Sequence, residues 1–277
     1  MITAVNARTL YEWLLDQDGP YRDGIDRWLA APEAPRYRDR LRTAAVHGSS
    51  WWTDEAVGGP DLLEELHALG RVADVLLLGP QLPDYLRLFT ALGMTPVEHP
   101  TRFDPFLHEI VEVEQAEDPR APIEVLDVRW PGLLLGELLF TRAGVRVRAG
   151  AAHAERGVAD RFPLYWTFRR THRPTRDLSQ GWGGNSQWRT DFRLDYRTAG
   201  GDRLNVAEAG AVDGRPDLGP YRDLSPEERL LTAAERRELL RHRSLLRTPA
   251  AAAELAAFPG WELELFPFEW RLPDGEA

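Results

Sequence analysis

Residues 133–149 read LLLGELLFTRAGVRVRA, and this stretch decides the expected fold. The segment 133–141 is almost wholly apolar, which is typical of a central strand in a sheet. The segment 142–144 resembles a hairpin turn, since it contains a glycine and separates two strand-like runs. In 145–149, valine and alanine alternate with arginine, which predicts a strand with one buried and one solvent-facing side. We therefore expect an antiparallel pair of strands at the centre of a sheet.

Similar strand patterns flank this stretch on both sides. They occupy residues 111–114, 123–130, 165–172, 188–196 and 261–266. In 188–196 the apolar side chains share one face, whereas arginines and aspartates share the other. We interpret Arg193 and Arg197, on this second face, as members of surface ladders of ion pairs, each of which contributes little stability.

Helix signals fill the first hundred residues and return near the C-terminus. Capping residues, prolines and glycines predict helix starts at or near Asn6, Pro35, Gly59, Pro83 and Thr232. Gly70 and Gly93 are predicted to end two of these helices, because glycine readily adopts the left-handed conformation that closes a helix. The short apolar run 72–78 fits a buried strand and a helix equally well.

The order of these patterns predicts an α+β fold. A mostly helical region, residues 1–100, would pack on an antiparallel β-sheet, sandwich-like or barrel-like. Residues 101–277 would form that sheet together with C-terminal helices that close it. The length of 277 residues suits one integrated globular unit made of both regions.

Two residue types are absent from the sequence, and each absence excludes a class of chemistry. Without cysteine there are no thiolate nucleophiles, no iron–sulfur clusters and no disulfides. All 34 basic residues are arginine. Arginine stays protonated and cannot act as an amine nucleophile, so a pyridoxal phosphate enzyme with its Schiff-base lysine is also excluded.

Charge and hydropathy limit the expected partners. The net charge of -10 and the pI of about 5.3 disfavour nucleic-acid binding, which needs a basic face. The N-terminus lacks the basic start and apolar run of a signal peptide, and the longest apolar runs are too short to cross a bilayer. We expect a cytoplasmic, acidic protein with no nucleic-acid partner and no membrane partner.

Nitrogen and oxygen side chains in the β-rich half are candidate ligands of a divalent metal ion. The candidates are His108, Glu112, His153 and His172. Such donors, without sulfur, suit iron, copper, zinc or manganese, and the sequence does not choose among these metals. His67 and His242 lie in amphipathic helix patterns, and we interpret both as solvated surface groups.

The secondary structure around His108 decides whether two of these ligands lie together. In a helix begun by Asp104, His108 and Glu112 would lie one turn apart on one face, which suits one ion. In a strand the same two residues would lie about 13 Å apart, and Glu112 and Glu114 would instead form a half-exposed acidic face. The alternation of Val111 with its neighbours favours the strand.

Residues 173–187 form a polar, glycine-rich loop between two predicted strands, where a ligand can approach the backbone closely. The candidate substrate-binding residues in and around it are Arg170, Trp182, Asn185, Gln187 and Arg189. The glycine spacing is not that of a dinucleotide-binding loop. The alternative is a tight loop whose polar side chains bond to their own backbone.

These patterns favour a small-molecule enzyme acting on an anionic or polar organic substrate at a histidine and carboxylate metal site. His172 and Glu112 are its candidate catalytic residues. Redox chemistry is favoured slightly over hydrolysis, because aromatic side chains shield reactive intermediates from water. The alternative is a non-catalytic acidic binding protein that neutralises or scaffolds a protein partner, with tryptophans as interface anchors.

Overall fold

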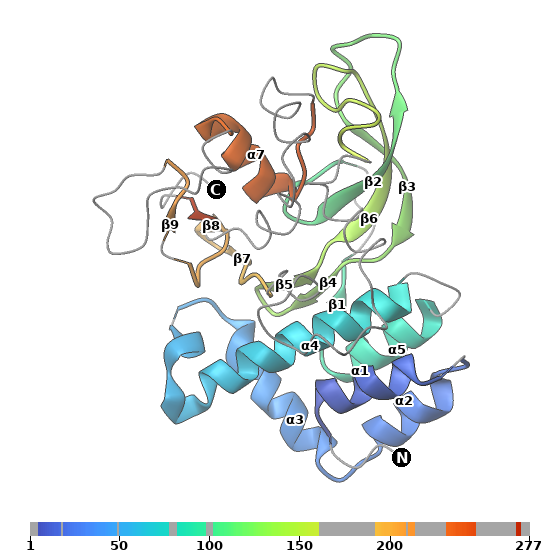
Figure 1. The fold of residues 1–277 in the computed structure, drawn as a ribbon, viewed down its shortest axis with the longest axis vertical. Coiled ribbons are helices and arrows are strands. Elements are labelled where there is room, and N and C mark those ends of the chain that lie inside the picture. The colour runs from blue at the N-terminus through green and yellow to red at the C-terminus, as the bar shows by residue number, and fades with distance from the viewer. Residues whose placement is uncertain are drawn as a thin grey trace.

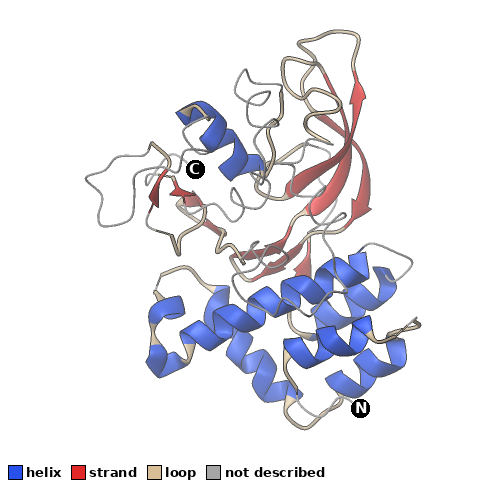
Figure 2. Ribbon diagram, in the orientation of Figure 1, coloured by secondary structure: helices blue, strands red, loops and turns tan. Residues whose placement is uncertain are grey.

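The computed structural model describes residues 5–17, 19–48, 50–77, 82–97, 102–160, 192–208, 210–213, 231–247 and 270–272. Within these residues the fold is α+β, as the sequence predicted. A layer of N-terminal helices lies against one β-sheet, a second sheet continues away from the helices, and a C-terminal helix lies on the far side (Figure 1). Figure 2 separates the helical layer from the strands above it.

The helical layer follows local sequence signals closely. Its helices are α1 (Ala7–Leu15), α2 (Arg22–Leu29), α3 (Ala34–Leu41), α4 (Gly59–Leu77) and α5 (Leu82–Ala91), with 3-10 turns at Arg42–Ala45, Trp51–Thr53 and Glu55–Val57. The Asn6 side chain accepts a hydrogen bond of 2.8 Å from the Thr9 backbone N–H, which confirms the predicted cap of α1. Gly93 follows α5 with a φ of 91°, as its predicted role as a helix stop requires.

Helix α4 does not stop at Gly70, so that prediction was wrong. The helix continues to Leu77, and the ambiguous run after Gly70 is helical. The reason is that Leu66, Leu69, Val72 and Leu76 are all buried at helical spacing, so the apolar stripe persists across the glycine. Burial of that stripe outweighs the roughly 1 kcal/mol that a glycine costs inside a helix.

The five-stranded sheet that packs against the helical layer is antiparallel. Its strand order is β1 (Thr95–Pro96), β4 (Leu133–Leu135), β5 (Leu138–Thr141), β7 (Tyr196–Thr198) and β8 (Gly201–Arg203). The predicted single strand over 133–141 is therefore two strands, β4 and β5, with a tight turn between them. Gly136 makes this turn possible, because its φ is 59° and a Cβ there would lie 2.5 Å from the Ala45 carbonyl oxygen.

The second sheet has the order β2 (His108–Gln115), β6 (Ala143–Ala149) and β3 (Glu124–Trp130). The predicted hairpin turn at 142–144 was wrong. The chain instead passes from β5 through Arg142 directly into β6, which belongs to the other sheet and pairs parallel with β2 and antiparallel with β3. A parallel neighbour on one side and an antiparallel neighbour on the other make β6 the centre of this sheet.

The remaining described elements lie at the C-terminal side. Strand β9 (Gly210–Ala211) pairs parallel with β10 (Trp270–Arg271), and α7 covers Ala233–His242. Thr232 caps α7 through a reciprocal capping box with Glu235, as its sequence predicted. The described strands do not close into a barrel.

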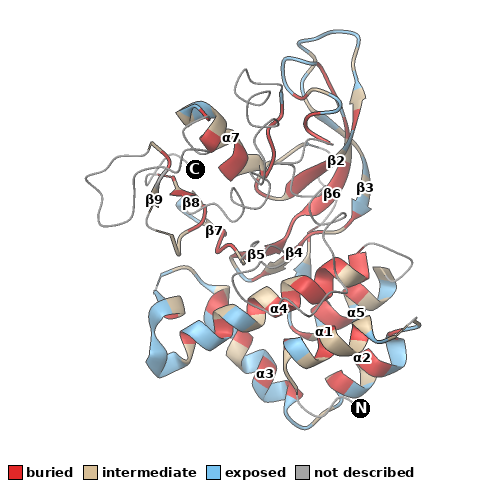
Figure 3. Ribbon diagram, in the orientation of Figure 1, coloured by how far each residue is buried: buried red, intermediate tan, exposed pale blue. Residues whose placement is uncertain are grey.

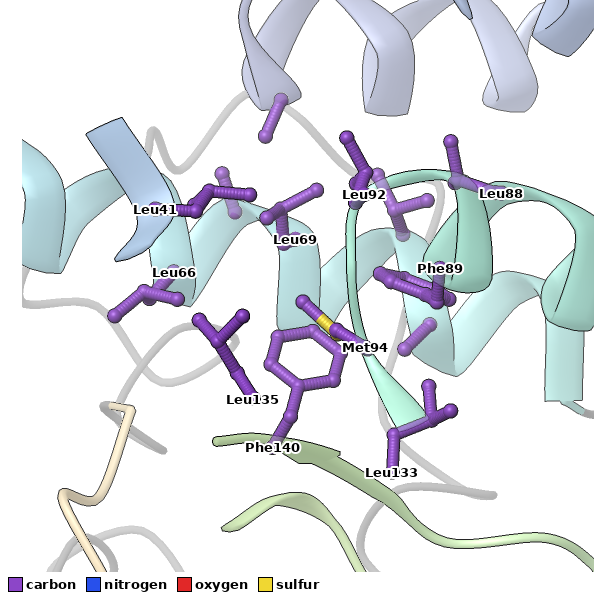
Figure 4. Close-up of a cluster of buried hydrophobic side chains, with 14 of the residues drawn as sticks. Leu41, Leu66, Leu69, Leu88, Phe89, Leu92, Met94, Leu133, Leu135 and Phe140 are labelled. Carbon is purple, nitrogen blue, oxygen red and sulfur yellow. The ribbon is translucent and has the colours of Figure 1, made fainter. Parts of the chain in front are cut away.

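Strand β5 lies between two hydrophobic cores. On one side Phe140 packs with Phe89 and Met94 of the helical layer, as Figure 4 shows. On the other side Leu139 packs with Leu239 and Leu240 of α7. Buried residues follow α4 and the central strands accordingly (Figure 3). Arg142 directly follows this strand, which is covered on both sides, and its side chain is therefore buried in the interior.

Candidate functional site

Several predicted site residues cannot be placed. They are Arg170, His172, Trp182, Asn185, Gln187 and Arg189, all of which lie outside the described residues. The predicted catalytic role of His172 and the predicted substrate loop therefore stay predictions.

The remaining predicted metal ligands lie in different environments. Glu112 is half-exposed on β2, where its carboxylate pairs with Arg129 at 2.9 Å and Arg146 at 3.4 Å. His153 is exposed in a turn after β6, whereas His108 is fully buried at the start of β2. Among the described residues, no three histidine, aspartate or glutamate side chains are grouped so that they could hold a metal ion.

The hydrogen bonding of His108 also disfavours a metal at this residue. Its Nδ1 accepts a hydrogen bond of 2.9 Å from the Asp104 backbone N–H. An imidazole nitrogen that accepts carries no proton, so the ring proton of the neutral side chain lies on Nε2. A metal-binding histidine shows the opposite arrangement, because it binds through one nitrogen and donates an N–H from the other.

A cluster of buried charges, which the sequence analysis did not identify as a site, lies close to His108. Its centre is the carboxylate of Asp195, and three guanidinium groups approach it. The contacts are 3.3 Å to Arg193, 3.4 Å to Arg243 and 3.7 Å to Arg142. We call these four residues the Asp195 cluster. Each of the four is at most 5% exposed, so water screens none of these charges.

Several elements converge to build the Asp195 cluster. Arg142 lies at the junction of β5 and β6, Arg193 and Asp195 precede β7, and Arg243 follows α7 in the left-handed conformation. Arg193 donates a hydrogen bond of 3.0 Å to the Leu240 carbonyl oxygen and so ties the cluster to α7. The backbone N–H of Asn205 donates to Asp195 at 2.8 Å.

The interpretation of Arg193 as a surface residue was therefore wrong. Among the described residues the strand predicted over 188–196 begins only at Tyr196, and Arg193 is buried, with its guanidinium bonded to α7 where we expected water. Arg197, in contrast, stays partly exposed and pairs with Asp104 and Asp202, each at 2.7 Å. Strand periodicity separates two faces and does not reveal that both are covered.

Arg142 is the least satisfied member of the cluster. Its side chain is fully buried, and none of its three guanidinium nitrogens has a hydrogen-bond partner among the described residues. Burial and the charge of Arg243 lower the pKa of Arg142 well below its ordinary value, against the opposing effects of Asp195 and the buried Glu109. Because a guanidinium does not lose its proton in proteins, the charge persists in an environment that disfavours it.

Asp195 is held as an anion. Burial raises the pKa of its carboxyl group, but Arg193, Arg243 and Arg142 together outweigh burial and lower it below the ordinary value. One ionised carboxylate thus serves three cations at separations of 3.3–3.7 Å, longer than a charge-assisted hydrogen bond of about 2.8 Å. The arrangement leaves the donors of Arg142 available to a further acceptor.

The rings of two histidines lie against Phe103, near this cluster. The His242 ring is stacked on Phe103 with centroids 6.1 Å apart, and the His108 ring lies 5.7 Å from Phe103. Burial, together with the positive charge of Arg142, lowers the pKa of His108 to about 4 and that of His242 to about 3. Both rings are therefore neutral near pH 7.

The interpretation of His242 and His67 as solvated surface groups was wrong. His242 is half-buried against Phe103, and burial lowers the pKa of His67, which is also half-buried, to about 4. One ring nitrogen of each, Nε2 of His67 and Nδ1 of His242, is shielded from water. A sequence signal did exist for Arg142, since a single arginine directly after a run buried on both sides has no route to water.

Comparison with known proteins gave no relative: no protein family, no curated protein and no solved structure is similar to this chain. Among the described residues, no helix is both long enough and apolar enough to cross a membrane.

Proposed function

We propose that the chain binds a small organic anion, carrying a carboxylate, sulfate or phosphate group, at the Asp195 cluster. The observation that carries this proposal is Arg142, a fully buried cation whose guanidinium nitrogens make no hydrogen bond within the part of the chain that the structure describes. In folded proteins nearly all buried polar groups have a partner, and an exception calls for a ligand, ion or water that completes it.

The chemistry of the cluster favours an anion over a neutral ligand. Arginine presents several N–H donors in a planar fork that matches carboxylate and oxyanion geometry. Each buried donor without a partner costs about 1–3 kcal/mol, and more where the group is charged. An anion contacting Arg142 would satisfy these donors and offset the repulsion from Arg193 and Arg243, which Asp195 and the buried Glu109 only partly balance.

In this proposal the bound anion is the same molecule as the anionic substrate that the sequence patterns favour for an enzyme. In the same proposal, Arg170, Trp182, Asn185, Gln187 and Arg189 help to hold it, and the protein works in the cytoplasm. A metal-dependent reaction, with His172 and Glu112 as catalytic residues and His108 and His153 as further ligands, is a separate hypothesis. The two ion pairs of Glu112 and the protonation of His108 count against it.

Calorimetric titration with sulfate, phosphate and succinate, at constant ionic strength in chloride, tests the proposal. We expect at least one anion to bind with one site per chain and to raise the melting temperature. An anion at 100 times its dissociation constant adds about 2.7 kcal/mol to the free energy of unfolding.

The decisive variant is Arg142→Met, which keeps a long side chain and removes the buried cation. We expect it to lose at least tenfold in affinity while the ligand-free protein stays as stable as the wild type or becomes more stable. The matched control is Arg148→Met on the exposed face of β6, which should bind as the wild type does. Equal affinity of the Arg142 and Arg148 variants, or no binding by the wild type, contradicts the proposal.

A further inference from the structure

We infer that His108 is a specificity-determining residue of this site, a neutral imidazole that donates its Nε2–H to the bound anion. The inference rests on the proposed function and extends it by naming a second ligand contact and the chemical class of group it accepts. It starts from one hydrogen bond and one buried atom.

The hydrogen bond fixes the position of the ring proton. The Asp104 backbone N–H can only donate, and it points to Nδ1 of His108 at 2.9 Å. The proton of the neutral ring is therefore on Nε2. Protonation of Nδ1 would place two donors face to face, so the same contact opposes a charged imidazolium.

The other ring nitrogen is the buried atom without a partner. Nε2 of His108 is shielded from water and makes no hydrogen bond to any residue that the structure describes, although His108 is completely buried. Strands β2 and β6 pair His108 with Ala143, which directly follows Arg142. Arg142 lies between β5 and β6, and burial together with its positive charge lowers the pKa of His108, so the two side chains lie in the same part of the interior. Each has unsatisfied N–H donors there, as a single shared acceptor requires.

Asp104 is held firmly enough to act as a positioning residue. Its carboxylate accepts two hydrogen bonds from Arg197, of 2.7 and 3.0 Å, and a third of 2.9 Å from the Phe106 backbone N–H. The Arg197 guanidinium lies 4.5 Å from the centre of the Phe106 ring. These contacts keep the Asp104 N–H directed at His108 and so maintain the Nε2–H form of the ring.

The donors define the ligand group. The guanidinium of Arg142 and the Nε2–H of His108 donate and cannot accept. They match a group that only accepts, such as a carboxylate or sulfate, and they reject a carboxamide, whose NH2 group would face other donors. We expect succinate to bind at least tenfold more tightly than succinamide, because unmatched buried donors are costly.

Two variants of similar size separate the donor from the structural role of His108. In His108→Asn the side-chain amide replaces the Nδ1 region, so it can still accept from Asp104 but cannot reach the ligand. In His108→Gln the amide NH2 reaches the position of Nε2, so the donor is kept while the Asp104 contact is lost. With the tightest-binding anion of the panel, we expect His108→Gln to stay within about threefold of wild-type affinity and His108→Asn to lose at least tenfold.

Nitrogen-15 NMR of the histidine rings supplies a readout that does not depend on affinity. We expect His108 to show the Nε2–H form in the ligand-free protein and a shifted Nε2–H resonance once the anion is bound. If the wild type binds an anion and His108→Asn binds it equally well, or if the proton is found on Nδ1, the inference fails and the anion site stands. If the wild type binds none of the anions, the proposed function fails and the inference with it.

Discussion

Two networks of arginines and carboxylates lie within a few residues of each other in this protein and differ in nearly every physical respect. On the outer face of the β2, β6 and β3 sheet, Glu114 pairs with Arg146 at 2.6 Å and with Arg148 at 2.7 Å. We call these pairs, with those of Glu112, the surface ladder. In the Asp195 cluster the contacts are longer, 3.3–3.7 Å, and every group is buried.

The comparison shows that distance alone does not rank ion pairs. The surface ladder has the shorter contacts, but water screens its charges and its long side chains lose entropy when held in place. The Asp195 cluster has the longer contacts, but its charges have lost their hydration and depend on each other. We therefore expect the same chemical change to have a large effect in the cluster and a small one in the ladder.

The largest difference should come from removing the central carboxylate. Asp195→Asn keeps the shape of the side chain and leaves Arg142, Arg193 and Arg243 without their shared anion. Loss of one partner of a buried ion pair costs about 3–5 kcal/mol, so we expect a loss of that size in the free energy of unfolding, measured by urea denaturation. The matched substitution in the ladder is Glu114→Gln. A loss under about 1 kcal/mol for Asp195→Asn would show that the cluster is not the strained network described above.

As pH falls, we expect the half-buried and buried histidines to lower the free energy of unfolding before the carboxylates of the surface ladder are protonated. Burial lowers the folded-state pKa of His67 and His108 to about 4 and that of His242 to about 3, against an ordinary value of 6.5. As pH falls below 6.5 the unfolded chain takes up protons that the folded protein refuses, so stability declines between pH 6.5 and 4. Each such histidine contributes roughly 1.4 kcal/mol per pH unit within this window.

Urea denaturation at pH 7 and pH 5 measures this decline. In His242→Phe, which keeps an aromatic ring beside Phe103, the dependence on pH should become shallower by the contribution of one histidine. An unchanged dependence on pH would mean that the His242 ring is not held neutral in the folded protein.

The smallest effect belongs to the surface ladder. Hydrogen bonding by Arg148 lowers the pKa of Glu114, but both groups are exposed to solvent. We expect Glu114→Gln to change the melting temperature by no more than about 2 °C, and the change to shrink further in 0.5 M sodium chloride. A thermal shift larger than that of Asp195→Asn would reverse the ranking of the two networks.

The sequence predicted best those features whose hydrogen bonds or backbone angles are formed between residues close together in the chain. The Asn6 cap, the Gly93 stop and the Thr232 capping box each depend on a hydrogen bond or backbone angle formed locally. The half-exposed acidic face of β2 was also predicted correctly, because alternation shows that one side of a strand is polar. These signals require no knowledge of what packs where.

The sequence-based predictions that were wrong all concern which distant parts of the chain pack over a residue. Gly70 continues a helix because the stripe on either side of it is buried, and Arg142 joins two sheets where a hairpin turn was expected. Arg193 and His242 were assigned to the surface because charged residues surround them in the sequence. Packing partners distant in the chain decide each case, and a local pattern contains no information about them.

The amino-acid sequence alone determined the fold class, most helix starts and the exclusion of thiol and lysine chemistry, because composition and short-range hydrogen bonding suffice for these. Tertiary structure decided where the candidate site lies. Arg142, Arg193, Asp195 and Arg243 come from three separate parts of the chain and meet only when β5 is covered on both sides. Charged side chains are stabilised by water when they are exposed. These four residues become a candidate site only because the folded protein excludes water from them.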